Sequence, residues 1–264
     1  MNDISATRAN SRSSDHAFTF TELLVVIVVI ALLALMVLPV LAGTAERSKR
    51  AACQNNLRQL AIGMTLYAGN NGGRIISART VAGTSVQNVL NLPDATAAGT
   101  VGLAVNSNST AWTCPNRPGL PIFEPAFPQW VIGYQYFGGI TTWRNPVGSF
   151  PSSSPTNLAH AGPHWVLAAD AVIKVNNVWG AVETGRELVY QNMPPHHTSD
   201  SLFPEGGNQA FVDGSVQWIP FEQMYFLHSW SPSSRLAFFY QNPKDFTPSL
   251  RLALARWGLL QARP

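Results

Sequence analysis

The longest uninterrupted apolar segment of the chain begins at Leu23 and ends at Ala42. Its twenty residues include no charged or strongly polar side chain. A helix of that length rises about 30 Å, which matches the hydrocarbon core of a bilayer. A cleaved secretory signal usually has a shorter apolar core, about 7–15 residues, followed by a small-residue cleavage site. The pattern therefore favours a membrane-spanning helix over a cleaved secretory signal.

The next segment, residues 45–67, continues with helical periodicity. Apolar side chains recur at intervals of four and three residues, and polar or basic side chains fill the other face. Gly and Asn residues at 69–73 predict the end of this helix. The two segments together predict one helix of about fifty residues, roughly 75 Å long. The apolar positions of the second segment are Cys53, Leu57, Leu60, Met64 and Tyr67.

The remainder of the chain, from about Gly72 to the end, has the short patterns of a β-rich body. The 19 prolines and 20 glycines of the chain favour many turns. Asp213-Gly214 lies between two β-like runs, and this predicts a hairpin with a two-residue turn. Strands are predicted over 131–137, 165–169, 209–212 and 215–219, the second of them ending at Asp170.

The last residues of the chain have the pattern of an amphipathic helix, with leucines and a tryptophan separated by arginines. We expect this helix to pack on the body, and binding to a membrane surface is the alternative. The residues that form the pattern are Leu250, Leu252, Leu254, Trp257 and Leu260, with Arg251, Arg256 and Arg263.

Composition narrows the functional classes. Charged residues make up 12% of the 264 residues, and 17 basic against 14 acidic side chains give a net charge of +3. So low a charge disfavours long disordered tails, and the absence of a dense basic patch disfavours a nucleic-acid-binding protein. Two cysteines exclude a disulfide-dense scaffold and a zinc site with four thiolates.

The residues at the start of the apolar segment carry a specific motif. The stretch AFTFTELLVVI, residues 17–27, resembles the class III signal of type IV pilins and type II secretion pseudopilins. If Phe18 is the first mature residue, Glu22 is the fifth and Pro39 the twenty-second, the positions at which that family has its Glu and often a helix-kinking Pro. Ala17 stands where the family usually has Gly.

The resemblance implies how the protein is processed and located. A prepilin peptidase would cut between Ala17 and Phe18 and methylate the new N-terminal amine. Glu22 would act in assembly with other pilin or pseudopilin subunits. The protein would be a single-pass protein of the inner (cytoplasmic) membrane with its head outside the cytoplasm. The positive-inside count favours the opposite orientation, because Arg47, Lys49 and Arg50 follow the span. We follow the resemblance, since the leader must meet a peptidase at the cytoplasmic face.

The resemblance also implies an α+β, pilin-like fold in which a long N-terminal transmembrane and stalk helix packs on a mostly antiparallel β head. The corresponding divisions of the chain are a leader over 1–17, a transmembrane helix over 18–42, a stalk helix over 43–71 and a globular head with a C-terminal helix over 72–264.

The body resembles a pseudopilin-like family that is abundant in planctomycete- and verrucomicrobium-type bacteria. Matching features are the stalk end at 53–60, Cys114-Pro115, Asp170 and Asp213-Gly214. That family often has a His that is separated from the Asp-Gly pair by nine intervening residues. Phe203 occupies this position here, and the nearest upstream histidine is His197.

Several side chains of the body are candidates for binding or cross-linking. His196 and His197 lie in a Pro-rich loop, where we expect surface residues rather than metal ligands. Asp170, Glu205 and Asp213 are candidates for a Ca²⁺ site, because Ca²⁺ prefers carboxylate and carbonyl oxygens, although no Asp-rich calcium loop is present. Apart from this Ca²⁺ candidate we expect no cofactor. 

The two cysteines leave two alternatives open. Outside the cytoplasm, Cys53 and Cys114 could form a disulfide that ties the stalk to the head. Alternatively they are two buried free thiols, since free cysteines are commonly buried.

These observations predict a structural protein and not an enzyme, since no catalytic triad order or phosphate-binding loop stands out. The expected function is a pilin- or pseudopilin-like subunit of a type II secretion-like pseudopilus or a surface filament. The alternative is a membrane-anchored binding protein of the cell envelope that does not polymerise. A membrane-anchored hydrolase is a third hypothesis, which would require a pocket with converging His and carboxylate groups.

Overall fold

The computed structural model describes residues 19–92, 94–105, 110–198 and 200–257, without the side chains of residues 36–43. By its internal contacts the chain divides into two compact units, residues 1–47 and 48–264. The predicted leader, 1–17, and Phe18, the predicted first mature residue, lie outside the described residues.

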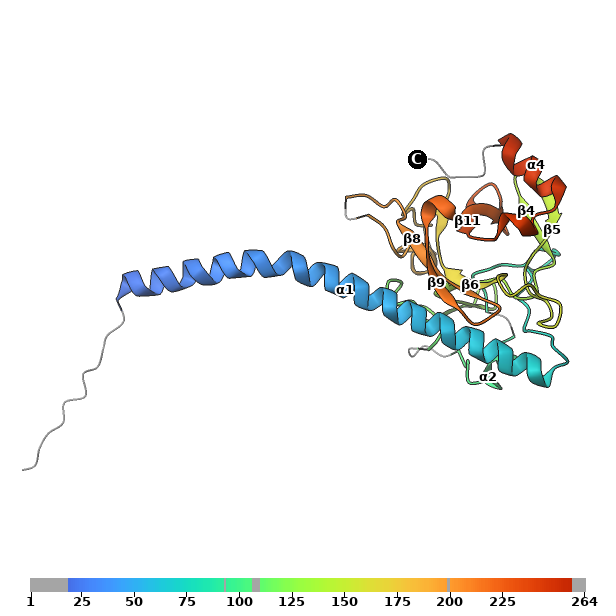
Figure 1. Ribbon diagram of the computed structural model, residues 1–264, viewed down its shortest axis with the longest axis horizontal. Coiled ribbons are helices and arrows are strands. Elements are labelled where there is room, and N and C mark those ends of the chain that lie inside the picture. Colours follow the sequence, from blue (N-terminus) through green and yellow to red (C-terminus); the bar gives the residue numbers. More distant parts are fainter. Residues whose placement is uncertain (1–18, 93, 106–109, 199, 258–264) are drawn as a thin grey trace, which may run out of the picture. The chain divides into compact units, whose positions relative to one another are not determined.

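The first element is helix α1, Phe20–Asn70, which has 51 residues (Figure 1). It begins with a reciprocal cap. The backbone N–H of Thr19 donates to the Glu22 carboxylate at 2.9 Å, and the N–H of Glu22 donates back to the Thr19 hydroxyl at 3.3 Å. Gly72 and Gly73 end the helix with φ angles of 61° and 79°, which a glycine adopts without strain. The prediction of one helix of about fifty residues is confirmed.

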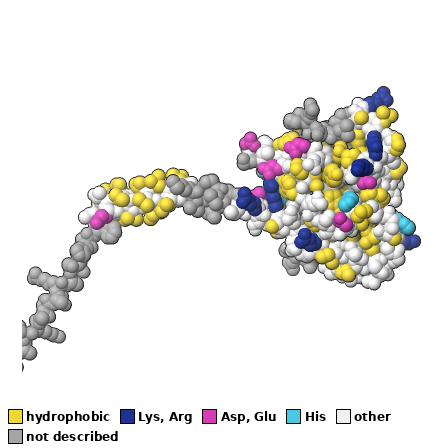
Figure 2. Space-filling model, viewed as in Figure 1, with side chains coloured by type: hydrophobic (Ala, Val, Ile, Leu, Met, Phe, Trp, Pro, Cys, Tyr) yellow, Lys and Arg dark blue, Asp and Glu magenta, His cyan; other side chains and the backbone are white. Residues whose placement is uncertain are grey.

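In the first unit, the stretch of α1 from Leu23 to Leu35 is apolar on all its faces. Its large apolar side chains between Phe20 and Leu35 are between 44% and 79% exposed. Figure 2 shows apolar side chains covering the visible face of this segment. Within the described residues, no helix meets the combined length and hydropathy criteria for a membrane span. The predicted span, 18–42, includes Pro39, whose side chain is not described; α1 continues through that position.

The described residues of the second unit form four small antiparallel sheets. A four-stranded sheet has the order β3-β6-β8-β9, a three-stranded sheet the order β10-β11-β7, and β1-β2 and β4-β5 form two-stranded ribbons. The strands are β1 (Ile122–Glu124), β2 (Gln129–Val131), β3 (Tyr134–Tyr136), β4 (Thr142–Asn145), β5 (Gly148–Pro151), β6 (Val166–Asp170), β7 (Ile173–Val175), β8 (Gly206–Phe211), β9 (Val216–Pro220), β10 (Tyr225–His228) and β11 (Arg235–Phe239).

Short helices connect and flank these sheets. They are α2 (Ala95–Gly99), α3 (Glu187–Tyr190), α4 (Pro248–Trp257) and two 3₁₀ turns, Phe221–Gln223 and Pro243–Asp245. A long α1 followed by an antiparallel β body makes this an α+β protein with a pilin-like layout, as expected.

The core of the second unit forms between the C-terminal part of α1 and the sheets. Cys53, Leu57, Leu60 and Met64 are fully buried there, which confirms the face predicted from the spacing of apolar residues. Strand β6 is buried along its whole length because it lies between β3 and β8 in the four-stranded sheet. The same core contains the predicted Asp170, which is the last residue of β6.

The prediction of one continuous strand over 131–137 is wrong, because the segment contains two separate strands. Strand β2 ends at Val131 and β3 begins at Tyr134. Gly133 lies between them, against another segment of backbone. A Cβ atom at Gly133 would lie 2.5 Å from the backbone nitrogen of Cys114. This crossing interrupts the strand, and only a residue without a side chain allows it.

The Asp213-Gly214 hairpin is confirmed, but the predicted two-residue turn is wrong. Phe211 donates its N–H to Ser215 at 3.0 Å, so three residues, and not two, lie between the paired positions. The N–H of Gly214 donates to Phe211, and Gly214 has a φ angle of 82°. These features are those of a three-residue loop in which the glycine takes the left-handed position.

The amphipathic pattern near the C-terminus does form a helix. In α4, Leu250 and Leu254 are fully buried against the core, whereas Leu252 is 72% exposed. The expected packing on the body is therefore confirmed for the described part of this helix. Leu260 and Arg263 lie outside the described residues.

Candidate functional site

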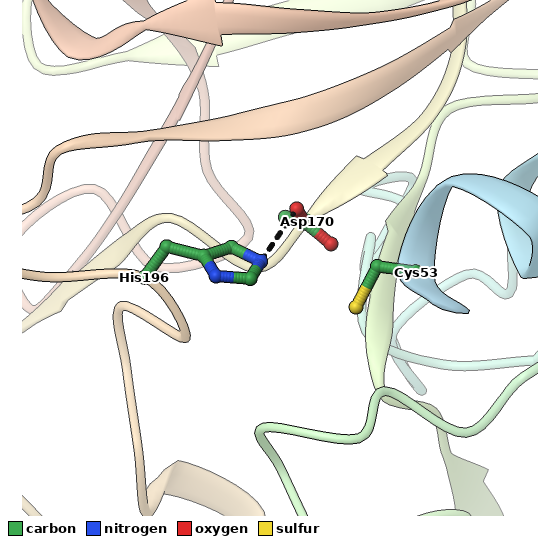
Figure 3. A group of neighbouring side chains, drawn as sticks. All are labelled: Cys53, Asp170 and His196. Carbon is green, nitrogen blue, oxygen red and sulfur yellow. Dashed lines mark ion pairs between the residues drawn. The ribbon is translucent and has the colours of Figure 1, made fainter. Parts of the chain in front are cut away.

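Three side chains that can ligate a metal meet in the interior of the second unit (Figure 3). Cys53 comes from α1, Asp170 from the end of β6, and His196 from the loop between α3 and β8. Each of the three residues is at most 1% exposed. One ligand atom of each residue lies within 4.8 Å of those of the other two. The fold therefore assembles a thiol, a carboxyl group and an imidazole from distant parts of the chain.

The carboxyl group of Asp170 is held by the neighbouring strand. Its Oδ2 accepts hydrogen bonds from the backbone N–H of Asn208 at 2.6 Å and from its side-chain amide at 2.9 Å. The same oxygen lies 3.1 Å from Nε2 of His196. Among the described residues, the other oxygen of Asp170, Oδ1, is buried without a hydrogen-bond partner. One oxygen is thus held in place, and the second is available to a ligand.

The ring of His196 is fixed on both sides. Its Nδ1 lies 3.1 Å from Nδ2 of Asn116, which also donates to the carbonyl of Pro195 at 2.9 Å. An amide N–H at Nδ1 makes that nitrogen the acceptor, so the neutral ring carries its proton on Nε2, toward Asp170. The expectation that His196 is a surface residue is wrong, because its loop folds inward. His197 is exposed, as expected, and its Nδ1 contacts the carbonyl of Thr198.

An aromatic and cationic stack covers the imidazole. The ring of Trp218 in β9 meets the ring of His196 edge to face, with centroids 5.3 Å apart. The guanidinium of Arg50 lies over the Trp218 ring, 4.1 Å from the ring centroid. It also forms an ion pair with Glu205. Cation–π and ion-pair contacts together hold this cover over the buried cluster.

The two cysteines are neighbours in the same interior. Both are buried free thiols, and their sulfur atoms are 3.5 Å apart. The contact with Cys114, together with burial, raises the pKa of the Cys53 thiol. The structure thus brings together the pair expected from the sequence. The disulfide itself stays a prediction.

A buried arginine lies in the same region. The guanidinium of Arg117 donates hydrogen bonds to the carbonyls of Gly133 at 3.1 Å and Val189 at 2.5 Å. Burial lowers its pKa from 12.5 to about 10, and the acidic groups of Cys114, Tyr190 and Asp170 oppose that shift. Arg117 therefore remains charged at neutral pH.

The three calcium candidates do not form one site among the described residues. Glu205 is paired with Arg50. Asp213 accepts hydrogen bonds from the backbone N–H of Ser215 at 2.9 Å and from its hydroxyl at 2.6 Å, as in a capped turn. Only Asp170 belongs to the group of metal-ligating side chains that the described residues bring together.

The N-terminal segment carries the second candidate site. The carboxylate of Glu22 takes part in the cap at the start of α1. Residues 12–38 match the prokaryotic N-terminal methylation motif. The chain therefore carries a prepilin-type signal, and the match includes Phe18 and Glu22 and ends one residue before Pro39.

This prepilin-type signal supports a pilin- or pseudopilin-type protein and implies processing by a prepilin peptidase. It points to a structural protein, and it suggests a membrane anchor with the head outside the cytoplasm. No curated protein and no solved structure was found to match the chain.

Some residues of the buried cluster had no signal in the sequence. Asn116, Asn208 and Trp218 are ordinary residues of a loop and two strands until the sheet register places them beside His196 and Asp170. Asp170 was recognisable as a polar residue at the end of an apolar strand. Asn208 lies inside β8 rather than at a strand end, and only the pairing of β6 with β8 places it beside Asp170.

Proposed function

We propose that the protein is a structural subunit of pilin or pseudopilin type. Its leader is removed between Ala17 and Phe18 by a prepilin peptidase, and the new N-terminal amine is methylated. The mature chain is anchored in the inner membrane by the segment 18–42, with the head outside the cytoplasm. It assembles with other subunits into a type II secretion-like pseudopilus or a surface filament. The methylation motif at residues 12–38 carries this proposal.

The apolar surface of the N-terminal part of α1 indicates that this segment lies in apolar surroundings. Large side chains from Phe20 to Leu35 are at least 44% exposed on every face of the helix. Apolar surface in contact with water costs about 25 cal/mol per Å². A helix that is apolar all round belongs in lipid or between other apolar helices. A membrane before assembly and a filament core after it would each supply that environment.

The position of Glu22 supports a role in assembly. In the unprocessed chain its carboxylate caps Thr19 at the start of α1. Cleavage before Phe18 would create a positively charged amine one residue before that cap. In a low-dielectric environment, the amine of a neighbouring subunit is a strongly favoured partner for this carboxylate, and either charge alone is costly. Their pairing would set the axial stagger between neighbouring helices.

N-terminal mass spectrometry of the protein extracted from membranes tests the proposal. We expect a mature chain that begins with N-methylated Phe18, and an intact chain in cells that lack the peptidase. A mature N-terminus beyond residue 42, or an intact Met1 chain where the peptidase is active, would overturn it. A correctly processed chain that forms no oligomers with its assembly machinery present would favour the non-polymerising envelope-binding protein instead.

A further inference from the structure

We propose that Cys53, Asp170 and His196 form a binding site for a zinc ion inside the second unit. The three ligand atoms lie within 4.8 Å of one another and come from α1, the end of β6 and the loop before β8. The inference does not depend on processing or polymerisation, because all three residues lie in the unit formed by residues 48–264.

The donor chemistry favours zinc over calcium or magnesium. Thiolate and imidazole are ligands that Zn²⁺ prefers, whereas Ca²⁺ and Mg²⁺ take oxygen ligands almost exclusively. A doubly charged ion bound by one thiolate, one carboxylate and one neutral imidazole gives a complex with no net charge. A neutral complex suits a site in which every ligand is at most 1% exposed, since burying an unbalanced charge is costly.

The distances between the ligand atoms are close to those of a zinc-bound site. Ligand atoms of a tetrahedral zinc site lie about 3.3–3.8 Å apart, given bonds of about 2.0–2.3 Å. Here Oδ2 of Asp170 and Nε2 of His196 are 3.1 Å apart, and one ligand atom from each of Cys53, Asp170 and His196 lies within 4.8 Å of those of the other two.

Unsatisfied polar atoms at the site point to a ligand. Oδ1 of Asp170 and Oδ1 of Asn208 are both buried without hydrogen-bond partners among the described residues. Such atoms are costly in a protein interior unless something binds them. A buried Asp–His pair alone would explain the contact at Oδ2 of Asp170, but it leaves Oδ1 without a partner.

Metal binding requires a change of tautomer at His196. Nε2 carries the ring proton when Asn116 donates to Nδ1, and this proton must leave before Nε2 can bind zinc. Nδ1 then carries a proton and needs an acceptor, as the second nitrogen of metal-bound histidines usually does. A rotated Asn116 amide presents its oxygen there. Asn116 therefore has to give up its bond to the carbonyl of Pro195 when zinc binds.

The sulfur of Cys53 cannot serve a zinc ion and a disulfide at once. Cys114 lies 3.5 Å from it but is not part of the group of three ligands. A Cys53–Cys114 disulfide would remove the thiolate that the metal needs. The zinc site therefore requires Cys53 to be a free thiol in the native protein.

The test measures zinc and cobalt binding by the full-length chain in detergent, after reduction and removal of metal. We expect about one zinc per chain, and a sulfur-to-cobalt charge-transfer band when Co²⁺ replaces Zn²⁺. Cys53→Ser should lose the charge-transfer band, and His196→Ala should lose stoichiometric binding of both metals. His197→Ala is the matched control, because this exposed neighbour should leave both readouts unchanged.

Thermal unfolding of each metal-free variant shows whether it is folded, and added zinc should raise the Tm of wild type and of His197→Ala only. Either of two results would overturn the proposal. One is wild-type protein that is folded and reduced but takes up no zinc or cobalt. The other is native protein, purified without reductant, in which peptide mapping finds Cys53 fully joined to Cys114.

Discussion

At the scale of single residues, His228 in β10 is a buried neutral histidine outside the metal-ligating cluster. Its Nδ1 accepts from the N–H of Arg144 at 3.2 Å, and its Nε2 lies 3.0 Å from the carbonyl of Gln87. Both contacts suit the tautomer with its proton on Nε2. Burial lowers the pKa of His228 from 6.5 to about 4, the bond to Gln87 opposes this shift, and the charge of Arg144 adds to it.

The lowered pKa of His228 predicts acid sensitivity. Below its ordinary pKa of 6.5, the unfolded chain takes up a proton that the folded chain refuses until about pH 4. Folding stability should therefore fall as the pH drops through this window, by about 2 kcal/mol between pH 7 and pH 5. Urea unfolding of the full chain in detergent, at both pH values, measures the loss. His228→Gln should show a smaller loss, and an equal loss in both proteins would contradict the assignment.

Glu22 carries the second prediction at this scale. Glu22→Val removes the carboxylate but keeps the segment apolar, so the chain should still insert and its head should still fold. Polymer formation should be blocked or lose its register, because the partner for the neighbouring amine is gone. Cross-linking and shear-fraction assays on whole cells compare the variant with wild type. Glu46→Ala, an acidic residue of α1 beyond the methylation motif, is the control and should assemble normally.

At the scale of elements, glycines show where the backbone itself is tightly packed. A Cβ at Gly133 would lie 2.5 Å from the nitrogen of Cys114 and 2.8 Å from the carbonyl oxygen of Trp112. These are backbone atoms, which cannot rotate away. Gly69, in the last turn of α1, has no atom within 4 Å of the corresponding position.

The two glycines therefore predict opposite effects of the same substitution. Gly133→Ala should destabilise the fold by about 3 kcal/mol or more, because the segments on either side must separate. Gly69→Ala should stabilise it by about 0.5–1 kcal/mol, because alanine loses less backbone entropy in a helix. Thermal unfolding of both variants beside wild type tests the pair. A Gly133→Ala protein with unchanged Tm would show that this crossing is looser than described.

Elements with local signals could be predicted from the sequence. The periodic apolar side chains of α1 and the apolar run that ends at Asp170 both depend on neighbours within a few residues, and both predictions are confirmed. The break before Tyr134 and the burial of His196 depend on segments distant in the chain. No local pattern encodes those contacts. For this reason the sequence indicates only part of the buried cluster, namely Asp170 and the cysteines.

At the scale of the whole molecule, one helix serves two different parts of the chain. From Leu23 to Leu35 the side chains of α1 are apolar and the large ones are exposed, whereas Cys53, Leu57, Leu60 and Met64 are fully buried in the core of the second unit. The residues of α1 from Ser48 onward group with that unit by their contacts. The C-terminal part of α1 is thus part of the core of the second unit.

This shared helix determines where the chain can be shortened. A truncated chain that begins at Ser48 keeps the buried face of α1 and should be monomeric and folded in water. One that begins at Gly72 should aggregate, because the sheets would expose the surface that Leu57, Leu60 and Met64 cover. Size-exclusion chromatography and circular dichroism of the two proteins distinguish these outcomes. A soluble, folded chain that begins at Gly72 would mean that the head folds without α1. Otherwise the C-terminal part of the anchoring helix is the first structural element of the head. A protease that releases the head from the membrane must then cut before Ser48 if the released head is to stay folded.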